Sequence, residues 1–229
     1  KTGIFSPKKP LQFVKDNGGN FTNGKLDQAW DVLLNPLSSN VYSSASEPIK
    51  APFNVSFYAK TSRSQTAGGQ TVGSTAFTSD SHNFVLMASQ INLGGGGLGF
   101  AIGNNNVSVY SHRAGHFGRP LSYSASFNDN YYYHYSFNVH DDGLLELFVD
   151  GELTHSANGQ ANYRIHPNGI GGTGWGGSWD GNDKNRFDGA IDEFRIYNRA
   201  LIEAEVAALY KLEKTVTRQN ILQPSDLIF

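Results

Sequence analysis

Apolar and polar residues alternate with a period of two in several segments of the chain, as they do in half-buried β-strands. In the segment 53–59, the apolar residues Phe53, Val55, Phe57 and Ala59 fall on one face. Aromatic and β-branched residues, which favour strands, are frequent in these segments, and Gly, Asn and Asp bound them. The same pattern predicts strands over residues 11–14, 29–34, 84–88, 98–102, 107–110, 133–139 and 144–149.

Short turn sequences join neighbouring strand segments. Asn104 and Asn105 stand between two of these segments, and the pair Asp150-Gly151 follows another. An Asp-Gly pair suits a type I′ turn because both central residues of that turn have positive φ. The pattern therefore predicts an all-β domain, a β-sandwich in which two antiparallel sheets pack face to face.

One segment near the C-terminus has a helical pattern instead. Residues 201–210 place apolar side chains on one face, and Glu203 and Glu205 stand early in the segment, where the helix dipole favours acids. We expect a short helix of two to three turns. Residues 211–229 show no clear period, so we assign residues 1–210 to a single domain and 211–229 to a C-terminal linker or tail.

Composition supports the β-sandwich and excludes several other classes. The 229 residues include 26 glycines, 13% are aromatic and only 17% are charged, against about a quarter charged in average proteins. Helical bundles, coiled coils and disordered chains are richer in charge or poorer in aromatics. A net charge of −2 gives no basic footprint for a nucleic-acid partner, and no apolar run reaches the length of a membrane span.

The chain contains no cysteine. This excludes disulfides, thiolate zinc sites, iron–sulfur clusters and a cysteine nucleophile. The sequence begins at Lys1 without an initiator Met or a signal peptide, so we expect an excised domain or mature fragment of a larger protein.

Four segments, in chain order, resemble one family. Residues 187–201 read FDGAIDEFRIYNRAL, and residues 52–60, 144–153 and 168–172 read PFNVSFYAK, LLELFVDGEL and NGIGG. They resemble bacterial laminin G-like domains of the concanavalin A-like lectin/glucanase superfamily, with Phe194 in place of the usual Val. The resemblance implies a jelly-roll sandwich. The imperfect alternation of the last strand also predicts a bulge near Asp192-Glu193.

The resemblance implies a non-catalytic, lectin-like or adhesion module of a larger bacterial secreted or surface protein. Its partners would be a glycan or cell-surface ligand and other domains of the same chain, and its location extracellular or on the cell surface. One alternative is a spacer that makes protein–protein contacts and has no sugar site. Another, less favoured alternative is a polysaccharide-degrading enzyme.

The residues disfavour the enzymatic alternative. Glucanases of the superfamily resemble E-x-D-x-x-E on one strand, where the period of two brings the acids into one cleft. This sequence lacks that motif: Glu146 and Asp150 have the wrong spacing, and the adjacent Asp192 and Glu193 face opposite ways. The histidines are scattered, and they predict no zinc site.

A glycine-rich segment before the last strand is the first candidate for ligand binding. It contains Trp175, Trp179, Asp180, Asn182 and Asp183. Tryptophan rings stack on the C–H faces of sugars, while Asp and Asn orient hydroxyl groups through hydrogen bonds. Two alternatives remain: a tryptophan that folds back against the sandwich edge, and a polar turn around Asp180.

Two further clusters are weaker candidates. Arg113, His116 and Arg119 stand in a predicted Gly-containing loop, where they would recognise an acidic sugar or a carboxylate, or would simply be solvated loop charges. In the consecutive tyrosines 131–133, Tyr132 should face away from its neighbours. One face of this run belongs to the core, and the other is a candidate aromatic platform.

Asp192 is the candidate metal ligand. Many members of the resembling superfamily bind one structural Ca²⁺ through an acid on the final strand and carbonyl oxygens near the N-terminus. Asp16 and Asn17 would supply partners if the first strand lay beside the last. Calcium takes six to eight oxygen ligands, so carbonyls and water would complete the set. The alternative is that Asp192 forms a salt bridge or caps a turn.

Overall fold

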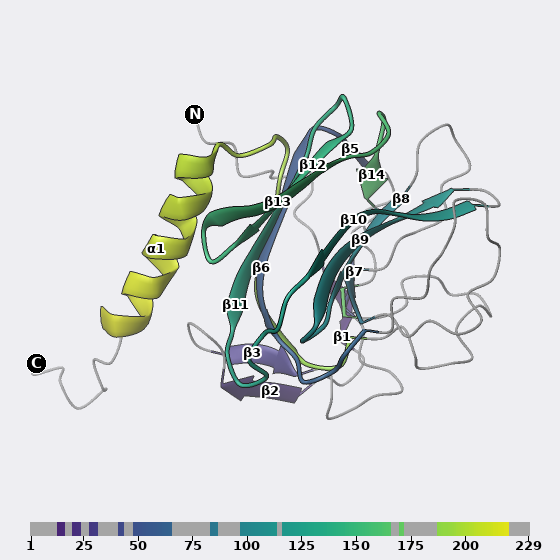
Figure 1. Ribbon diagram of the computed structural model, residues 1–229. Helices are drawn as coiled ribbons and strands as arrows, with labels where there is room; N and C mark the ends of the chain where they lie inside the picture. Colours follow the sequence, from purple (N-terminus) through teal and green to yellow (C-terminus); the bar gives the residue numbers. More distant parts are fainter. Residues whose placement is uncertain are drawn as a thin grey trace, which may run out of the picture.

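The computed structural model describes residues 13–16, 20–23, 28–31, 41–43, 48–65, 83–86, 97–113, 116–165, 170–171 and 187–219. Within these residues, two sheets pack face to face (Figure 1). The seven-stranded sheet has the order β13 (Glu152–Asn158), β12 (Leu144–Val149), β11 (Tyr133–Val139), β6 (Phe53–Lys60), β15 (Ala190–Tyr197), β3 (Gln28–Asp31) and β2 (Asn20–Asn23). The β-sandwich predicted from the sequence is confirmed.

The second sheet has six strands among the described residues. Its order is β10 (His116–Ser124), β9 (Asn106–Arg113), β8 (Gly97–Ile102), β14 (Arg164–Ile165) and β5 (Ile49–Lys50), with β7 (Phe84–Leu86) also paired to β8. All pairings in it are antiparallel except that of β14 with β8. A separate pair is formed by β1 (Phe13–Asp16) and β4 (Val41–Ser43).

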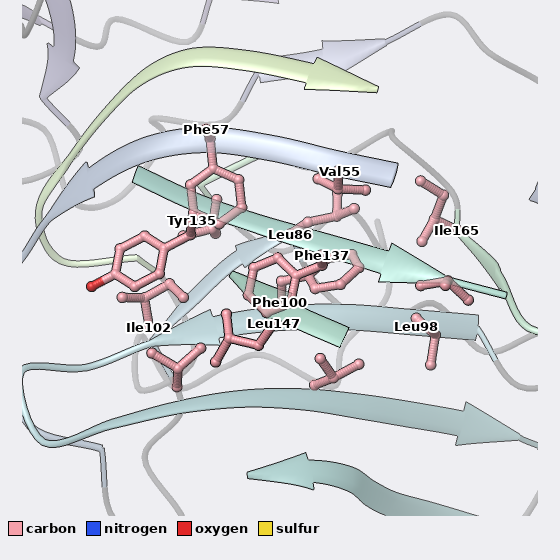
Figure 2. Close-up of a cluster of buried hydrophobic side chains, with 14 of the residues drawn as sticks. Val55, Phe57, Leu86, Leu98, Phe100, Ile102, Tyr135, Phe137, Leu147 and Ile165 are labelled. Carbon is pink, nitrogen blue, oxygen red and sulfur yellow. The ribbon is translucent and has the colours of Figure 1, made fainter. Parts of the chain in front are cut away.

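The core fills the space between the two sheets with the apolar faces that the sequence pattern predicts. Phe57 and Phe137 from the seven-stranded sheet meet Phe100 from the six-stranded sheet (Figure 2). The ring centroids of Phe100 and Phe137 are 4.7 Å apart. All three side chains are almost completely buried, and each such burial stabilises the fold by about 1.5–3 kcal/mol.

Both predicted hairpin turns are present. Strands β8 and β9 pair on either side of Asn104-Asn105. Asp150 and Gly151 have φ values of 51° and 86°, the two positive angles that a type I′ turn requires. Position 151 also requires a residue without a side chain, because a Cβ there would lie 3.1 Å from the Cβ of Tyr210. The turn thus supports close approach of the C-terminal helix.

Helix α1 (Glu203–Gln219) is longer than the sequence predicted. Lys, Leu and Glu at 211–214 are good helix formers and continue the helix begun at 203, so the predicted length of two to three turns is wrong. The assignment of residues 211–229 to a linker or tail stays a prediction. Val206 packs against Phe148 on the outer face of the seven-stranded sheet. Figure 1 shows α1 along β11, β12 and β13, on the side away from β8–β10.

The start of α1 is fixed by one acidic side chain. The carboxylate of Glu205 accepts a hydrogen bond from the backbone N–H of Ile202 at 3.1 Å, as in a capping box. The same carboxylate forms a bidentate ion pair with Arg199, with both N–O distances 2.6 Å. The Arg199 guanidinium lowers the pKa of Glu205 to about 2 through these hydrogen bonds. Glu205 lies in the first turn of α1, where the helix dipole also favours an acidic side chain.

Candidate functional site

The tryptophan segment falls outside the described residues. Trp175, Trp179, Asp180, Asn182 and Asp183 all belong to it. Their assignment to ligand binding stays a prediction.

The arginine cluster lies on strands, and its assignment to a loop is wrong. Strand β9 extends to Arg113, and His116, which begins β10, is paired with Arg113. Arg119 lies farther along β10. The sequence pattern missed β10 because its first half has no apolar alternation and contains Gly118 and Pro120. The side chain of Arg113 lies outside the described part of the structure, whereas that of Arg119 lies within it.

Alternation places Lys50 and Arg164 on the outer face of the six-stranded sheet. Ile49 and Ile165, which are paired with each other, belong to or pack against the core. Their neighbours Lys50 and Arg164, also paired with each other, therefore project to the opposite face. Arg164 is paired with Gly97 of β8 as well, so this position carries no side chain beside the guanidinium.

The row continues across β8 to β9 and β10. Gly97 is paired with His112, which consequently lies on the same face as Arg164. On β10, the register shifts between Gly118 and Leu121, so Arg119 and Pro120 lie opposite Tyr110. Val109 and Leu121, which are paired, belong to the core, so Tyr110 faces outward and the bulge places Arg119 on the same side.

We call the set Lys50, Arg164, His112 and Arg119 the basic face. Lys50 is exposed, and the other three side chains are half-buried. The four residues come from β5, β14, β9 and β10, so with strands about 4.8 Å apart the basic face extends about 19 Å across the sheet. Such a row offers several donors on one side of the sheet, although Ser108 and Tyr110 on the same side of β9 are buried.

Two guanidinium nitrogens on the basic face are buried without an acceptor. The Nη1 atom of Arg119 and the Nε atom of Arg164 have no hydrogen-bond partner among the described residues. Buried donors of this kind are rare in folded proteins, since most find an acceptor. Both atoms are also shielded from solvent, so a ligand acceptor reaches them only if the side chains turn outward.

Most carboxylates described on the seven-stranded sheet have structural partners. Glu146 accepts hydrogen bonds from Asn138 at 2.9 Å and His140 at 2.8 Å. Asp150 accepts the backbone N–H of His134 at 2.9 Å. These contacts hold β11, β12 and the turn after β12 together.

Asp192 lies at the predicted bulge. The register with β6 shifts between Asp192 and Arg195, and Glu193 has a positive φ of 51°. Asp192 is 8% exposed, and its Oδ1 accepts the backbone N–H of Glu193 at 2.8 Å. The bulge prediction is confirmed, and part of this carboxylate satisfies the backbone at the bulge.

The strand beside Asp192 is not the one that the calcium hypothesis named. Strand β15 pairs with β3 and β6, whereas β1, which ends at Asp16, pairs with β4. Asn17 lies outside the described residues. No group of three or more acidic or histidine side chains suited to a metal occurs among the residues described. The described side chains alone therefore do not form a calcium site, and one at Asp192 would depend on backbone oxygens.

The three consecutive tyrosines alternate as predicted. Tyr132 is buried with Tyr58, and the Nζ atom of Lys60 lies 4.8 Å from its ring centroid. Tyr131 faces the other way, is 39% exposed and makes an edge contact with Tyr133 at 4.7 Å. One tyrosine ring is thus exposed at this end of the sandwich.

A laminin G family model, described as the concanavalin A-like lectin/glucanases superfamily, matches residues 38–207. The chain belongs to this superfamily. The resemblance noted in the sequence is confirmed. No curated protein matches the chain.

Several solved structures share the fold. Domain 4 of AbnA, an extracellular arabinanase of Geobacillus stearothermophilus in complex with arabinotriose, has 18% identity and a TM-score of 0.55, with 84% of this chain and 82% of that chain covered. The binding domain of Paraclostridial Mosquitocidal Protein 1 has 16% identity and a TM-score of 0.57. The match covers 88% of this chain and 47% of that one, so this chain spans about half the toxin domain's length.

Sequence reasoning found only part of the basic face. It singled out Arg119 and missed Lys50 and Arg164, which come from two-residue strands without a detectable period. The signal that was available is that the segments of β5, β9, β10 and β14 contain Lys and Arg but no Asp or Glu. Among the described residues, no helix has the length and apolar character of a membrane span.

Proposed function

We propose that this domain is a non-catalytic carbohydrate-binding module of a secreted or surface-exposed protein. The observation that carries the proposal is the basic face, a row of polar donors on the outside of one sheet of a lectin-superfamily sandwich. The donors include two arginine nitrogens that are buried without an acceptor among the described residues. A glycan offers the hydroxyl or carboxylate oxygens that such donors bind.

The absence of catalysis is part of the proposal. Retaining and inverting glycosidases need two carboxyl groups, one of them free to transfer a proton. Glu146 and Asp150 are instead engaged by strand and turn contacts. The arabinanase domain of similar fold, whose structure contains arabinotriose, supports a sugar-binding role for this architecture. That arabinanase domain is the fourth of its protein, and we propose that this domain likewise works beside other domains of a longer chain.

A glycan array with the 229-residue chain, with and without calcium, tests the proposal. We expect binding to a defined glycan class, followed by no release of reducing ends when that glycan is incubated with the protein. A folded protein that binds no glycan would instead support a spacer role. Release of reducing ends would assign the domain to the enzymes of its superfamily.

A further inference from the structure

The two sheets of the sandwich carry opposite charge. In the described strands, the six-stranded sheet contains no Asp or Glu, but has the cations Lys50, Arg113, Arg119 and Arg164. The strands of the seven-stranded sheet contain the acids Asp31, Glu146, Glu152, Asp192 and Glu193 with the cations Lys60 and Arg195. The positive sheet belongs to a chain whose net charge is −2, so its charge is local and not a consequence of overall composition.

The geometry of this positive sheet favours a ligand with spaced negative charges. Lys50 and Arg164 are directly paired, which is unfavourable for two cations unless an anion lies near them. Gly97 next to Arg164 has no side chain that could pair with the guanidinium, whose Nε atom is buried. On β10, the bulge directs Arg119 to the same face of the sheet as Lys50 and Arg164.

The guanidinium groups of Arg119 and Arg164 indicate the chemistry of the ligand. Arg119 Nη1 and Arg164 Nε are donors on planar guanidinium groups, which bind carboxylate and sulfate oxygens through two parallel hydrogen bonds. A neutral sugar hydroxyl presents one oxygen instead of the two that match parallel N–H donors, and it brings no charge to balance the row. The ligand should therefore carry an acidic group at intervals along its length.

We propose that the basic face binds an acidic polysaccharide, one with carboxylate or sulfate groups along the chain. The proposal rests on the carbohydrate-binding function above and names the ligand class for the same face. Arg164 and Arg119 each hold one acidic group, and Lys50 adds charge at the exposed edge of the row. A nucleic acid, with its denser charge, would be opposed by the acids of the rest of the chain.

Titration calorimetry with three probes tests the ligand class. The probes are an oligogalacturonate for carboxylate, a heparin oligosaccharide for sulfate, and the methyl ester of the oligogalacturonate as a neutral match. We expect one or both acidic probes to bind, the methyl ester to bind at least about tenfold more weakly, and affinity to fall as NaCl is raised. The two acidic probes separate carboxylate from sulfate recognition.

Variants locate the site. Arg164→Ala and Arg119→Ala should each weaken binding of the acidic probe by about ten- to a hundredfold, since each removes charged hydrogen bonds. Lys50→Glu reverses charge at an exposed position and tests the same face without touching the core. Lys211→Glu, which makes the same charge reversal at an exposed position of α1 over the other sheet, is the matched control and should bind as the wild type does.

The outcomes separate this proposal from the function on which it rests. Binding of neutral glycans, unchanged by the three basic-face variants, would overturn the acidic ligand and leave carbohydrate binding intact. Acidic-probe binding that Lys211→Glu weakens as much as Lys50→Glu would also overturn it, as would equally tight binding of a DNA oligonucleotide. A folded protein that binds no glycan at all would remove both proposals. If Arg164→Ala lowers the melting temperature, its weaker binding can come from loss of folded protein. The effect of Lys50→Glu on binding then decides whether the basic face is the site.

Discussion

The Nε2 atom of His134 lies 2.8 Å from the hydroxyl oxygen of Ser56 on the neighbouring strand. The imidazole is stacked on Tyr210 of α1, with 6.1 Å between ring centroids, and contacts Tyr58 from the side. Burial, with a smaller contribution from the charge of Arg195, lowers the pKa of His134 to about 4 from its usual 6.5. A neutral histidine is thus part of the contact between helix and sheet.

This contact makes stability depend on pH. Because the folded pKa is depressed and the unfolded pKa is about 6.5, the stabilisation is complete above pH 6.5 and is lost as pH falls toward 4. From about pH 7 to about pH 5, His134 should lower the free energy of unfolding by about 2 kcal/mol. Urea denaturation at the two pH values measures this loss.

The matched variants are His134→Gln, which keeps a polar group beside Ser56 but does not titrate, and His155→Gln on β13. The first should reduce the loss of stability between the two pH values, whereas the second should leave it as in the wild type. Equal losses in all three proteins would show that other groups control the acid response.

Asn138 fixes the entry to α1 through two backbone hydrogen bonds. Its Nδ2 donates to the carbonyl of Leu201 at 2.7 Å, and its Oδ1 accepts the N–H of Leu201 at 2.9 Å. Asn138→Ala leaves both buried backbone groups without a partner, which should cost about 2–4 kcal/mol. Chemical denaturation of Asn138→Ala and of the exposed control Asn158→Ala measures the difference. Similar losses in both variants would rule out this docking role.

The Asp150-Gly151 turn makes a second stability prediction. Gly151→Ala adds a side chain at φ 86° and within 3.1 Å of Tyr210, so it should destabilise the protein by about 1–3 kcal/mol. Gly118→Ala on β10 is the matched control, since a Cβ there meets no atom within 4 Å. Thermal melts compare the two. A Gly151→Ala protein as stable as the control would mean that α1 does not press against this turn.

How far the sequence predicted this fold depends on how each strand is buried. Strands β11 and β12 agree with the predicted bounds, and in β11 strict alternation marks a strand with one face in the core. Strand β10 was missed because its first half contains Gly118 and Pro120 and its inward apolar residues start only at Leu121. The end of α1 was missed because residues after 210 lack a period.

The candidate site was harder to predict than the fold because it is assembled from distant segments. Lys50 and Arg164 are adjacent only through the pairing of β5 with β14, two strands too short to show any pattern. Outward-facing charges on a β-sheet ordinarily indicate no more than solvent exposure. Only the pairing shows that the cations gather on one face.

The calcium hypothesis makes a prediction that the structure does not test. If Ca²⁺ binds at Asp192, its addition raises the melting temperature by the linkage between binding and folding, and chelation reverses the change. Asp192→Asn should abolish this response, while Asp141→Asn, an exposed acid in the turn before β12, should retain it. A melting temperature that chelator leaves unchanged would reject the site.

Trp179→Ala and Asp180→Ala distinguish the tryptophan segment from the basic face as the ligand site. If Trp179 stacks on the sugar, its removal should weaken binding about five- to a hundredfold with little change in melting temperature. If the ring instead packs against the sandwich, the melting temperature should fall by several degrees while affinity stays unchanged. Both quantities are measured on the same protein, with Arg119→Ala alongside. Loss of affinity in Trp179→Ala and in Arg119→Ala would show that the ligand contacts both, whereas loss in Arg119→Ala alone would confine it to the six-stranded sheet.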